Sequence, residues 1–529
     1  MNPGRTPLFR SLMRAMRTSA ASQRTRRDFI RLTGASAASV TLGATGLRAQ
    51  DAEKKEEKPA AEAKPAKKIE GPVAIVGGGI AGLTAAYRLM KAGVEVHLYE
   101  AAQRFGGRMW TKRDFNKDGM FVELGGELVD TNHEDLIALA KELGVELQNL
   151  KEGDTGLDFY HFGGKIYTDH DVIAAFGGLS KRIAADAEGI YDDKEEFTAK
   201  ARQFDNISLK DYLKQIGAGT DRWLLQMLEV AYVPEYGLDA EEQSALNLID
   251  FINPDTANGF QVFGESDEAF RIRGGNDTLP TAVHREIERG VKCHSGHRLV
   301  KIAEDAGKLK LSFATETKVL TPTYANVIMA LPFTILRTIE GIAALKLSEE
   351  KQKVIKEMGY GTNLKVMYGF SEKTWRKPAG GREFFCNGAV YSDKPFQTCW
   401  ETSRGQAGES GIITNFMGGS LGAQFEQARL DKFVTELDEV FPGVKAKVDP
   451  AARTMMNWPS IKTMRGSYSC PKVGQYTWMY EAAASPELDG HLIFAGEHTS
   501  ATSPGFMNGG VESGNRAASE LLGTSDRAE

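Results

Sequence analysis

The segment from Val73 to Glu100, VAIVGGGIAGLTAAYRLMKAGVEVHLYE, constrains the fold of this chain more than any other. Four apolar residues, typical of a strand buried in a parallel sheet, lead directly into glycines. Gly77, Gly79 and Gly82 fill the pattern G-x-G-x-x-G, which permits a tight turn, a close approach to a pyrophosphate and close helix packing. Glu100 ends the next strand, where a carboxylate accepts hydrogen bonds from ribose hydroxyls. The segment therefore predicts a Rossmann-type βαβ unit that binds a dinucleotide.

The glycine pattern alone does not distinguish NAD from FAD, and composition sets only broad limits. The chain has 529 residues, enough for more than one domain, and 41% of them are hydrophobic. The net charge of −6 gives no reason to expect nucleic acid as a partner. No apolar run reaches transmembrane length, so we expect no stable membrane anchor.

The four cysteines predict neither a metal site nor a disulfide framework. Cys293, Cys386, Cys399 and Cys470 include no CxxC pair and no zinc-ligand spacing. We expect buried free thiols, and a bond between Cys386 and Cys399 is left open as the alternative.

The N-terminal part differs in composition from the rest. Residues 1–49 are rich in arginine and contain TRRDFIRL (25–32), followed by a run of small residues, which resembles a twin-arginine export signal. An ordinary basic tail is the alternative. Residues 50–70, built from Ala, Glu, Lys and Pro, predict a linker. We therefore expect the twin-arginine export machinery to carry the folded protein to the periplasm or outside the cell.

Three segments identify the dinucleotide. EAAQRFGGRMWT (100–111) follows the βαβ unit, FVELGGELVDTNH (121–133) comes next, and HLIFAGEHTSATSPGFMNGGVESGNRAASEL (491–521) lies near the other end. Together they resemble the flavin-containing amine oxidase family, which includes monoamine, polyamine and L-amino-acid oxidases. The resemblance extends over roughly residues 73–522 and implies FAD as the cofactor.

The resemblance also implies a role for individual residues. Besides Gly77, Gly79, Gly82 and Glu100, the cofactor-binding residues are expected to be Gly107 and Arg108 at the pyrophosphate, Gly125 and Gly126 near the flavin ring, Val300 at the adenine, Gly496 and Glu497 along the ribityl and phosphate part, and Trp458, Phe506 and Met507. A helix that begins near Met507 directs its positive end at the flavin.

Three residues are expected to carry the chemistry. Lys365, in the apolar run GYGTNLKVMYGF, matches the family lysine that contacts flavin N5 through a water and assists reoxidation. Tyr468 lies ten residues after Trp458, and with Phe506 it takes the place of the two aromatic walls that hold the amine nitrogen. Ser467 stands where some relatives have a cysteine that binds the cofactor covalently, so we expect non-covalent FAD.

The predicted reaction is oxidative deamination of a primary amine or polyamine. Hydride transfer to flavin N5, followed by reaction with O2, gives an aldehyde, ammonia and hydrogen peroxide. Glu127 and Asp130 favour a substrate with a second amino group over one with a carboxylate. The alternative is an L-amino-acid oxidase that yields a 2-oxo acid, with Arg271 or Arg273 holding the carboxylate. A flavin desaturase and a non-catalytic FAD scaffold are less consistent with Lys365 and the aromatic walls. A homodimer is consistent with the sequence.

The predicted fold class is α/β: a Rossmann-like FAD-binding domain with a parallel sheet and flanking helices, joined to a second α+β substrate-binding domain. The FAD-binding domain is assigned to residues 71–130, 276–332 and 485–522. A helical and substrate-binding region covers 131–275, and a substrate-binding sheet covers 333–484.

Overall fold

The computed structural model describes residues 69–257, 259–378, 381–424 and 429–524. The predicted export signal lies outside these residues, as does nearly all of the predicted linker. A five-stranded parallel sheet has the order β20 (Leu492–Phe494), β14 (Asn326–Met329), β1 (Val73–Val76), β2 (Val96–Tyr99) and β9 (Val291–His294). The sheet therefore combines segments from both ends of the described chain, as expected for a Rossmann-like domain.

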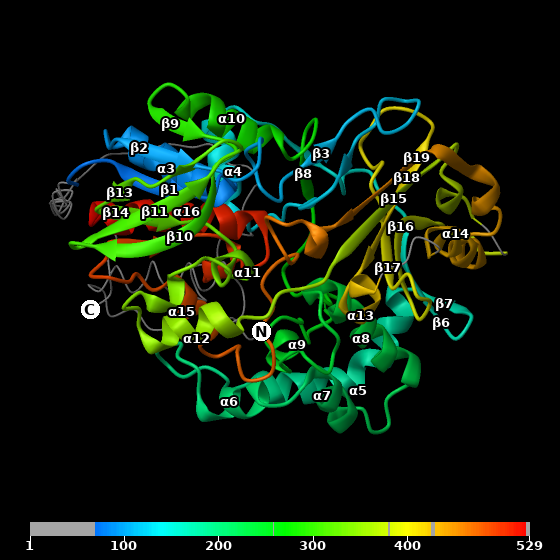
Figure 1. Ribbon diagram of the computed structural model, residues 1–529. Coiled ribbons are helices and arrows are strands. Elements are labelled where there is room, and N and C mark those ends of the chain that lie inside the picture. Colours follow the sequence, from blue (N-terminus) through cyan, green and yellow to red (C-terminus); the bar gives the residue numbers. More distant parts are fainter. Residues whose placement is uncertain (1–68, 258, 379–380, 425–428, 525–529) are drawn as a thin grey trace, which may run out of the picture.

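The two faces of this sheet are covered differently (Figure 1). One face packs against α3 (Ile80–Lys91), α4 (Glu134–Glu142), α10 (Thr278–Ile287) and α16 (Met507–Leu522). The other face packs against an antiparallel layer of β10 (Arg298–Asp305), β11 (Lys308–Ala314), β12 (Val319–Leu320) and β13 (Thr323–Tyr324), with α11 (Phe333–Leu336), α12 (Glu349–Glu357) and α15 (Met479–Ala484). Both faces are thus buried, which explains why β1 and β20 consist of apolar residues only.

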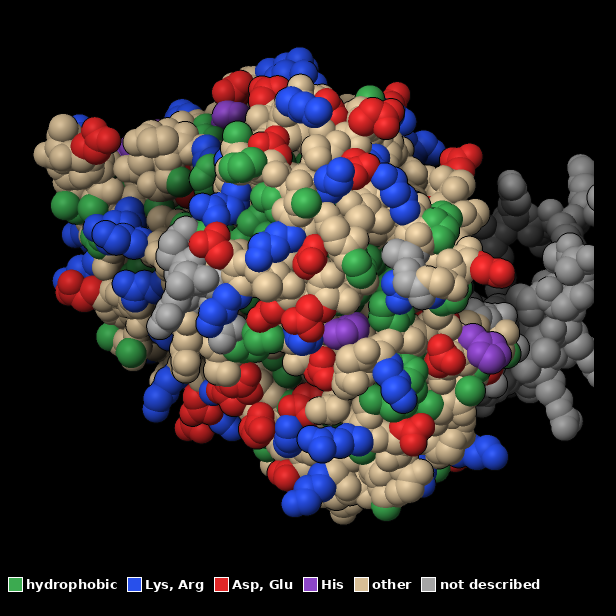
Figure 2. Space-filling model, turned by 90° about the vertical axis from the view of Figure 1, so that its right-hand side faces the viewer, with side chains coloured by type: hydrophobic (Ala, Val, Ile, Leu, Met, Phe, Trp, Pro, Cys, Tyr) green, Lys and Arg blue, Asp and Glu red, His purple; other side chains and the backbone are tan. Residues whose placement is uncertain are grey.

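A second sheet, on the right of Figure 1, has seven strands. Its order is β19 (Val448–Asn457), β15 (Leu364–Phe370), β18 (Gly411–Met417), β17 (Thr398–Glu401), β16 (Cys386–Ser392), β6 (Leu157–Phe162) and β7 (Lys165–Tyr167). Neighbours are antiparallel except β16 and β6, and α14 (Arg429–Val440) packs on one face. Basic and acidic side chains are interspersed over the molecular face shown in Figure 2.

A helical layer lies below the two sheets in Figure 1. It contains α5 (Asp169–Ala187), α6 (Ala199–Asp205), α7 (Leu209–Ile216), α8 (Arg222–Tyr236) and α9 (Leu246–Ile249), which share one hydrophobic core. Thr168 forms a capping box at the start of α5, and Ser208 caps α7. Helix α8 ends at Gly237, whose φ of 75° gives a left-handed C-cap. Residues at the end of α8 reach the cavity described below.

The packing departs from the predicted boundaries in three places. Helix α4, placed by the sequence in the helical region, belongs to the core of the parallel sheet. Strands β6 and β7, from that same predicted region, complete the seven-stranded sheet. Helices α11 and α12 pack under β14 rather than with the substrate sheet. Tertiary packing, which local patterns do not reveal, accounts for each difference.

Two small ribbons lie between the layers. They are formed by the short strands β3 (Thr111–Lys112), β4 (Val122–Glu123), β5 (Leu147–Asn149) and β8 (Phe270–Ile272).

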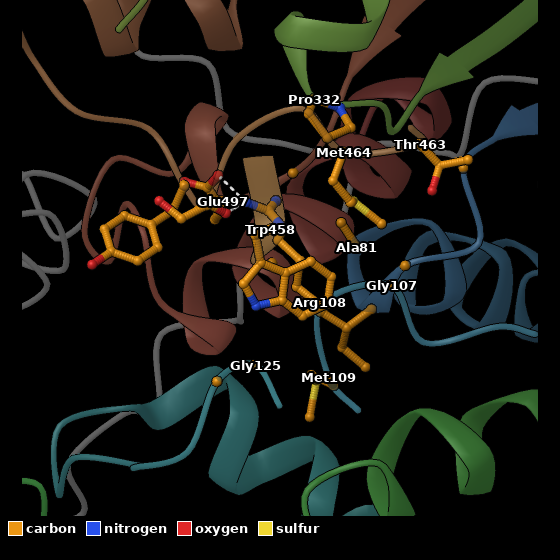
Figure 3. A pocket seen from close by; sticks show the side chains of 18 of the residues that line it. Ala81, Gly107, Arg108, Met109, Gly125, Pro332, Trp458, Thr463, Met464 and Glu497 are labelled. Atoms are coloured by element: carbon orange, nitrogen blue, oxygen red, sulfur yellow. Dashed lines mark hydrogen bonds and ion pairs between the residues drawn. The ribbon is translucent and has the colours of Figure 1, made fainter. Parts of the chain in front are cut away.

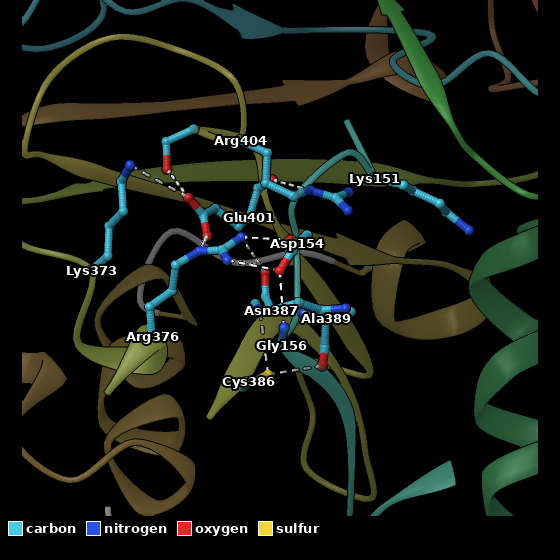
Figure 4. Close-up of polar contacts among 12 residues, drawn as sticks. Lys151, Asp154, Gly156, Lys373, Arg376, Cys386, Asn387, Ala389, Glu401 and Arg404 are labelled. Carbon is cyan, nitrogen blue, oxygen red and sulfur yellow. Dashed lines mark hydrogen bonds and ion pairs between the residues drawn. The ribbon is translucent and has the colours of Figure 1, made fainter. Parts of the chain in front are cut away.

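A buried polar cluster fixes one loop to the seven-stranded sheet (Figure 4). The Arg376 guanidinium donates to both carboxylate oxygens of Asp154, at 2.9 Å each, and also pairs with Glu401 on β17. The Trp375 indole donates to the same Glu401 carboxylate at 2.8 Å.

The four cysteines are free thiols, three of them buried, so the expected buried thiols are confirmed for all except the half-buried Cys293.

Candidate active site

A cavity of about 390 Å³ is lined by segments from the whole described chain. All but one of the predicted cofactor-binding and catalytic residues line it: Gly77, Gly79, Glu100, Gly107, Arg108, Gly125, Gly126, Val300, Lys365, Trp458, Tyr468, Gly496, Glu497, Phe506 and Met507. We call the part around Gly77–Ile80 and Glu100 the nucleotide end, and the part around Lys365, Tyr468 and Phe506 the substrate end. Gly82 does not line the cavity.

The nucleotide end is built from backbone that only glycine permits. Gly77 has a φ of +110°, and a Cβ there would lie 2.3 Å from the carbonyl oxygen of Ala330. A Cβ on Gly82 would lie 1.9 Å from the Gly77 carbonyl oxygen. Gly82 therefore acts by letting α3 pack against the strand, not by contact with the cofactor.

Glu100 is held at the rim of this end by the backbone. Its carboxylate oxygens accept from the amides of Gly78 and Ala102, both at 2.7 Å. Burial raises the pKa of Glu100, and these two donors oppose the rise. Glu100 therefore keeps further lone pairs free for an incoming hydroxyl.

Glu497 ties together three segments that meet at the cavity. Its carboxylate pairs with Arg108 at 2.8 Å (Figure 3), accepts from the Ser469 hydroxyl at 2.7 Å and accepts from the Gly505 amide at 2.9 Å. Burial alone would raise the pKa of Glu497, but Arg108 and the donated hydrogen bonds hold it below its ordinary value. Since Ser469 and Gly505 each adjoin an aromatic wall, Glu497 positions both walls.

The segment before Glu127 approaches its neighbours closely. A Cβ on Gly125 would lie 1.7 Å from the Arg108 carbonyl oxygen, and one on Gly126 would lie 2.6 Å from Cγ of Met507. The Trp458 indole donates to the Leu124 carbonyl at 3.0 Å. The two glycines therefore bring the backbone carbonyl of Gly125 to the middle of the cavity.

Lys365 is buried on β15 and points at this backbone. Its ammonium donates to the Gly125 carbonyl and to the Glu127 carboxylate, both at 2.8 Å, and a longer contact of 3.4 Å reaches the Glu123 carbonyl. Burial alone would raise the pKa of Glu127, but Lys365 lowers it below its ordinary value. The Thr402 hydroxyl donates to the other Glu127 oxygen at 2.8 Å. Both oxygens of the Glu127 carboxylate are thus hydrogen-bonded.

Of the two predicted acidic substrate contacts, only Glu127 lines the cavity, where it is the counter-ion of Lys365. Asp130 is buried away from the cavity lining, where it accepts from the Glu268 amide at 2.8 Å and lies 3.3 Å from the His133 ring nitrogen Nε2. Sequence spacing could not show either pairing, because Lys365 and Glu268 come from distant segments.

Neither arginine proposed for a substrate carboxylate lines the cavity. Arg271 is buried, and its guanidinium donates to the carbonyls of Thr402 and Arg404 at 2.8 and 2.7 Å. Arg273 is exposed and pairs with Glu146 at 2.9 Å.

Tyr468 and Phe506 are brought together at the substrate end. The Tyr468 hydroxyl donates to the carbonyls of Pro234 and Glu235 at 3.0 and 2.6 Å. Phe506 precedes α16, and its ring centroid lies 5.1 Å from that of His133. A Cβ on Gly505 would lie 3.6 Å from Cδ2 of Tyr468. The two rings therefore come from adjoining segments of the cavity lining.

A family model described as flavin containing amine oxidoreductase matches residues 80–522. The chain belongs to this family. It is accordingly a flavin-dependent oxidoreductase that acts on amines, and the predicted fold class and enzyme class are confirmed.

Individual members of the flavin amine oxidoreductase family share modest identity with the chain. The L-amino-acid oxidase of Vipera ammodytes ammodytes is 26% identical over 488 residues, covering 87% of this chain and 95% of that protein. The nicotine dehydrogenase of Pseudomonas putida is 26% identical over 502 residues, covering 94% and 96%. The solved structure of cyclohexylamine oxidase from Brevibacterium oxydans superposes with a TM-score of 0.72 at 20% identity, covering 86% and 99%. That superposition supports the fold.

The residues of this amine oxidoreductase fit FAD on structural grounds. The N-termini of α3 and α16 both open into the cavity, and neither helix has an acidic residue in its first turn, so their positive ends are free for phosphate or for anionic flavin. Ala81, Gly107, Thr463 and Met464 all line the cavity (Figure 3). Within the described residues, no cluster of His, Cys, Asp or Glu is arranged to hold a metal ion, and none of the helices is long and apolar enough to cross a membrane.

Sequence reasoning missed several residues that line the substrate end, chiefly Glu235, Glu268 and Trp400. Glu235 lies in the last turn of α8, where the helix dipole disfavours a carboxylate. Glu268 has a φ of 50°, unusual for a residue other than glycine. The sequence does contain a signal for Glu235, because PEYG predicts the end of a helix. No sequence signal marks Glu268.

Proposed function

We propose that this chain is an FAD-dependent oxidase that deaminates a primary amine or polyamine. The amine and O2 give an aldehyde, ammonia and hydrogen peroxide. The observation that carries the proposal is the meeting of Lys365, Tyr468 and Phe506 in the same cavity as the nucleotide-binding glycines.

Each of these residues has a distinct role. The faces of Tyr468 and Phe506 bind and orient the amine nitrogen through their electron-rich surfaces. When bound, FAD supplies the acceptor for hydrogen from the carbon beside that nitrogen. The Lys365 ammonium has three N–H donors. Two of them have acceptors at 2.8 Å, and the third makes only a 3.4 Å contact with the Glu123 carbonyl, so this N–H is available to a water at the cofactor.

The charges of the cavity favour an amine over an amino acid. Arg108 and Lys365 are each paired with a glutamate, and neither Arg271 nor Arg273 lines the cavity. These four cations are thus not available to a substrate carboxylate. The similarity to a snake L-amino-acid oxidase keeps amino acid oxidation as the second candidate.

Three further parts of the proposal concern the cofactor and the location. Non-covalent FAD is supported by Ser467 beside Tyr468, and by Cys470, which is buried against Asn247 and Pro471 and does not line the cavity. Oxygen as acceptor is proposed from the family resemblance. Export by the twin-arginine route is proposed from the arginine pair and the small-residue run alone.

A peroxide-coupled screen of the purified protein tests this function. We expect peroxide from monoamines or polyamines and little from common L-amino acids. Peroxide only from amino acids would establish the second candidate, and a flavin-containing protein that makes none with any substrate would contradict the oxidase proposal.

The role of Lys365 is tested by rapid kinetics. Lys365→Met should leave FAD bound but slow its reoxidation by O2 by about tenfold or more, as loss of a charged hydrogen bond predicts. Lys373→Met, whose cation lies 3.8 Å from Glu401 outside the cavity, is the matched control. Equal oxygen kinetics in both variants would contradict the role of Lys365.

A further inference from the structure

We propose that Glu235 and Glu268 together bind a second cationic group of the substrate, so that a diamine or polyamine is preferred over a monoamine. This inference rests on the proposed amine oxidase function. It assigns the recognition of the second amino group to residues other than the acids that the sequence suggested.

Glu235 lies directly behind one aromatic wall. Its backbone carbonyl accepts the Tyr468 hydroxyl at 2.6 Å, so the end of α8 and this wall are fixed relative to each other. Glu235 lines the cavity, and its carboxylate has no hydrogen bond or ion pair with a described residue. Helix α8 also has no basic residue in its last turn to offset the charge.

Glu268 is linked to the other aromatic wall through two residues. The Phe506 ring packs on His133, which contacts Asp130, and the Asp130 carboxylate accepts the Glu268 amide at 2.8 Å. This hydrogen bond holds Glu268 in its left-handed conformation while the residue lines the cavity. Such backbone strain persists where the surroundings impose it, and it is concentrated at binding sites.

The electrostatic surroundings of the pair favour an incoming cation. Burial, then Glu268 and Asp130, raise the pKa of Glu235 to about 8. Burial and Asp130 raise the pKa of Glu268 to about 7, although Arg404 and Lys151, which are both labelled in Figure 4, oppose the rise. Neither of these cations pairs with Glu268. A cation bound beside these two carboxyl groups would favour their ionised forms.

The arrangement also explains the order of the two groups. The aromatic walls hold the amine that reacts, as proposed above. The two glutamates line the same cavity from α8 and from the segment before β8. A substrate with a positive charge at each end can therefore fill both subsites at once, whereas a monoamine leaves two carboxylates without a partner.

Substrate comparison tests the proposal. We would measure kcat/KM for α,ω-diamines of three to eight carbons and for n-alkylamines of the same length, in the wild type and in Glu235→Gln, Glu268→Gln and the double variant. The diamine-to-monoamine ratio should fall about 10- to 100-fold in the double variant, as loss of a charged contact predicts. Glu229→Gln, on the same helix but paired with Lys210 outside the cavity, should keep the wild-type ratio.

A ratio that stays unchanged in all of the cavity variants would overturn the proposal. If the double variant does not fold, the wild type is compared on diamines and on amino alcohols of equal length. A tenfold preference for the diamine supports the subsite, and equal kcat/KM values overturn it. Failure of the proposed function is a separate result, because the wild type would then oxidise neither diamines nor monoamines.

Discussion

The two ends of the cavity treat carboxylates in opposite ways. At the nucleotide end and in the middle, Glu100, Glu497 and Glu127 accept from backbone amides, hydroxyls or a paired cation. At the substrate end, Glu235 and Glu268 have no such partner among the described residues. The carboxylates of a cofactor site have their hydrogen-bond and ion-pair partners mainly within the protein, because the cofactor remains bound. A site for a passing substrate keeps carboxyl groups whose ionised form is favoured only when a cationic substrate lies beside them.

The largest effect is expected at the nucleotide end, from Gly77→Ala. The new Cβ would meet the Ala330 carbonyl at 2.3 Å on a backbone with a φ of +110°, so the loss in free energy of unfolding should exceed about 5 kcal/mol. Thermal unfolding and the ratio of flavin to protein absorbance measure it. Gly93→Ala is the control: its φ is also positive, at +77°, but no atom lies within 4 Å, so a cost of about 1 kcal/mol is expected. Similar losses in both variants would contradict the steric argument.

The next effect concerns the ion pair in the middle of the cavity. Lys365→Met leaves Glu127 buried without its cation and should lower the free energy of unfolding by about 3–5 kcal/mol. Adding Glu127→Gln removes the uncompensated charge and should recover most of that loss. Denaturant unfolding of the single and double variants measures this. An undiminished loss in the double variant would show that Lys365 stabilises the fold by packing instead.

A smaller effect should come from Glu497, which joins the two ends. Glu497→Gln weakens the contact with Arg108 and the hydrogen bonds from Ser469 and Gly505, at an expected cost of about 2–3 kcal/mol. Because the aromatic walls adjoin these segments, KM for the amine should also rise. Ser469→Ala removes a single hydrogen bond and should cost about 1 kcal/mol. An unchanged KM in Glu497→Gln would limit this residue to a structural role.

The smallest effect distinguishes the two buried lysines. Lys351, under the parallel sheet, donates to the Ala483 carbonyl at 2.6 Å and has no paired carboxylate, unlike Lys365. Burial lowers its pKa to about 7, so between about pH 7 and 10 the unfolded chain binds the extra proton and this group's contribution to stability rises with pH. Lys351→Met should therefore add about 1–2 kcal/mol at pH 7. That gain should shrink toward pH 10 in thermal unfolding measured across this range, and a gain independent of pH would contradict the assignment.

The same contrast explains what the sequence could predict. The nucleotide end depends on backbone conformation within short segments, so Gly77, Gly82 and Glu100 form a local pattern with a fixed meaning. The segments of the cofactor domain near the two ends of the described chain could both be recognised from such local patterns. The charge balance of the substrate end arises from pairs distant in sequence, such as Lys365 with Glu127. For that reason the sequence does not predict the pairing of Glu127, the position of Asp130 outside the cavity lining, or the presence of Glu235 and Glu268 in it.

The position of β14 between β1 and β20 has a consequence for biosynthesis. A ribosome completes β1 long before it makes β20 and the helix that follows, and until then β14 has an unpaired edge. The nascent chain therefore cannot close its cofactor cavity before β20 and α16 have been made. Flavin capture must follow the synthesis of these elements, and a chain that stops before β20 leaves an apolar edge exposed to aggregation.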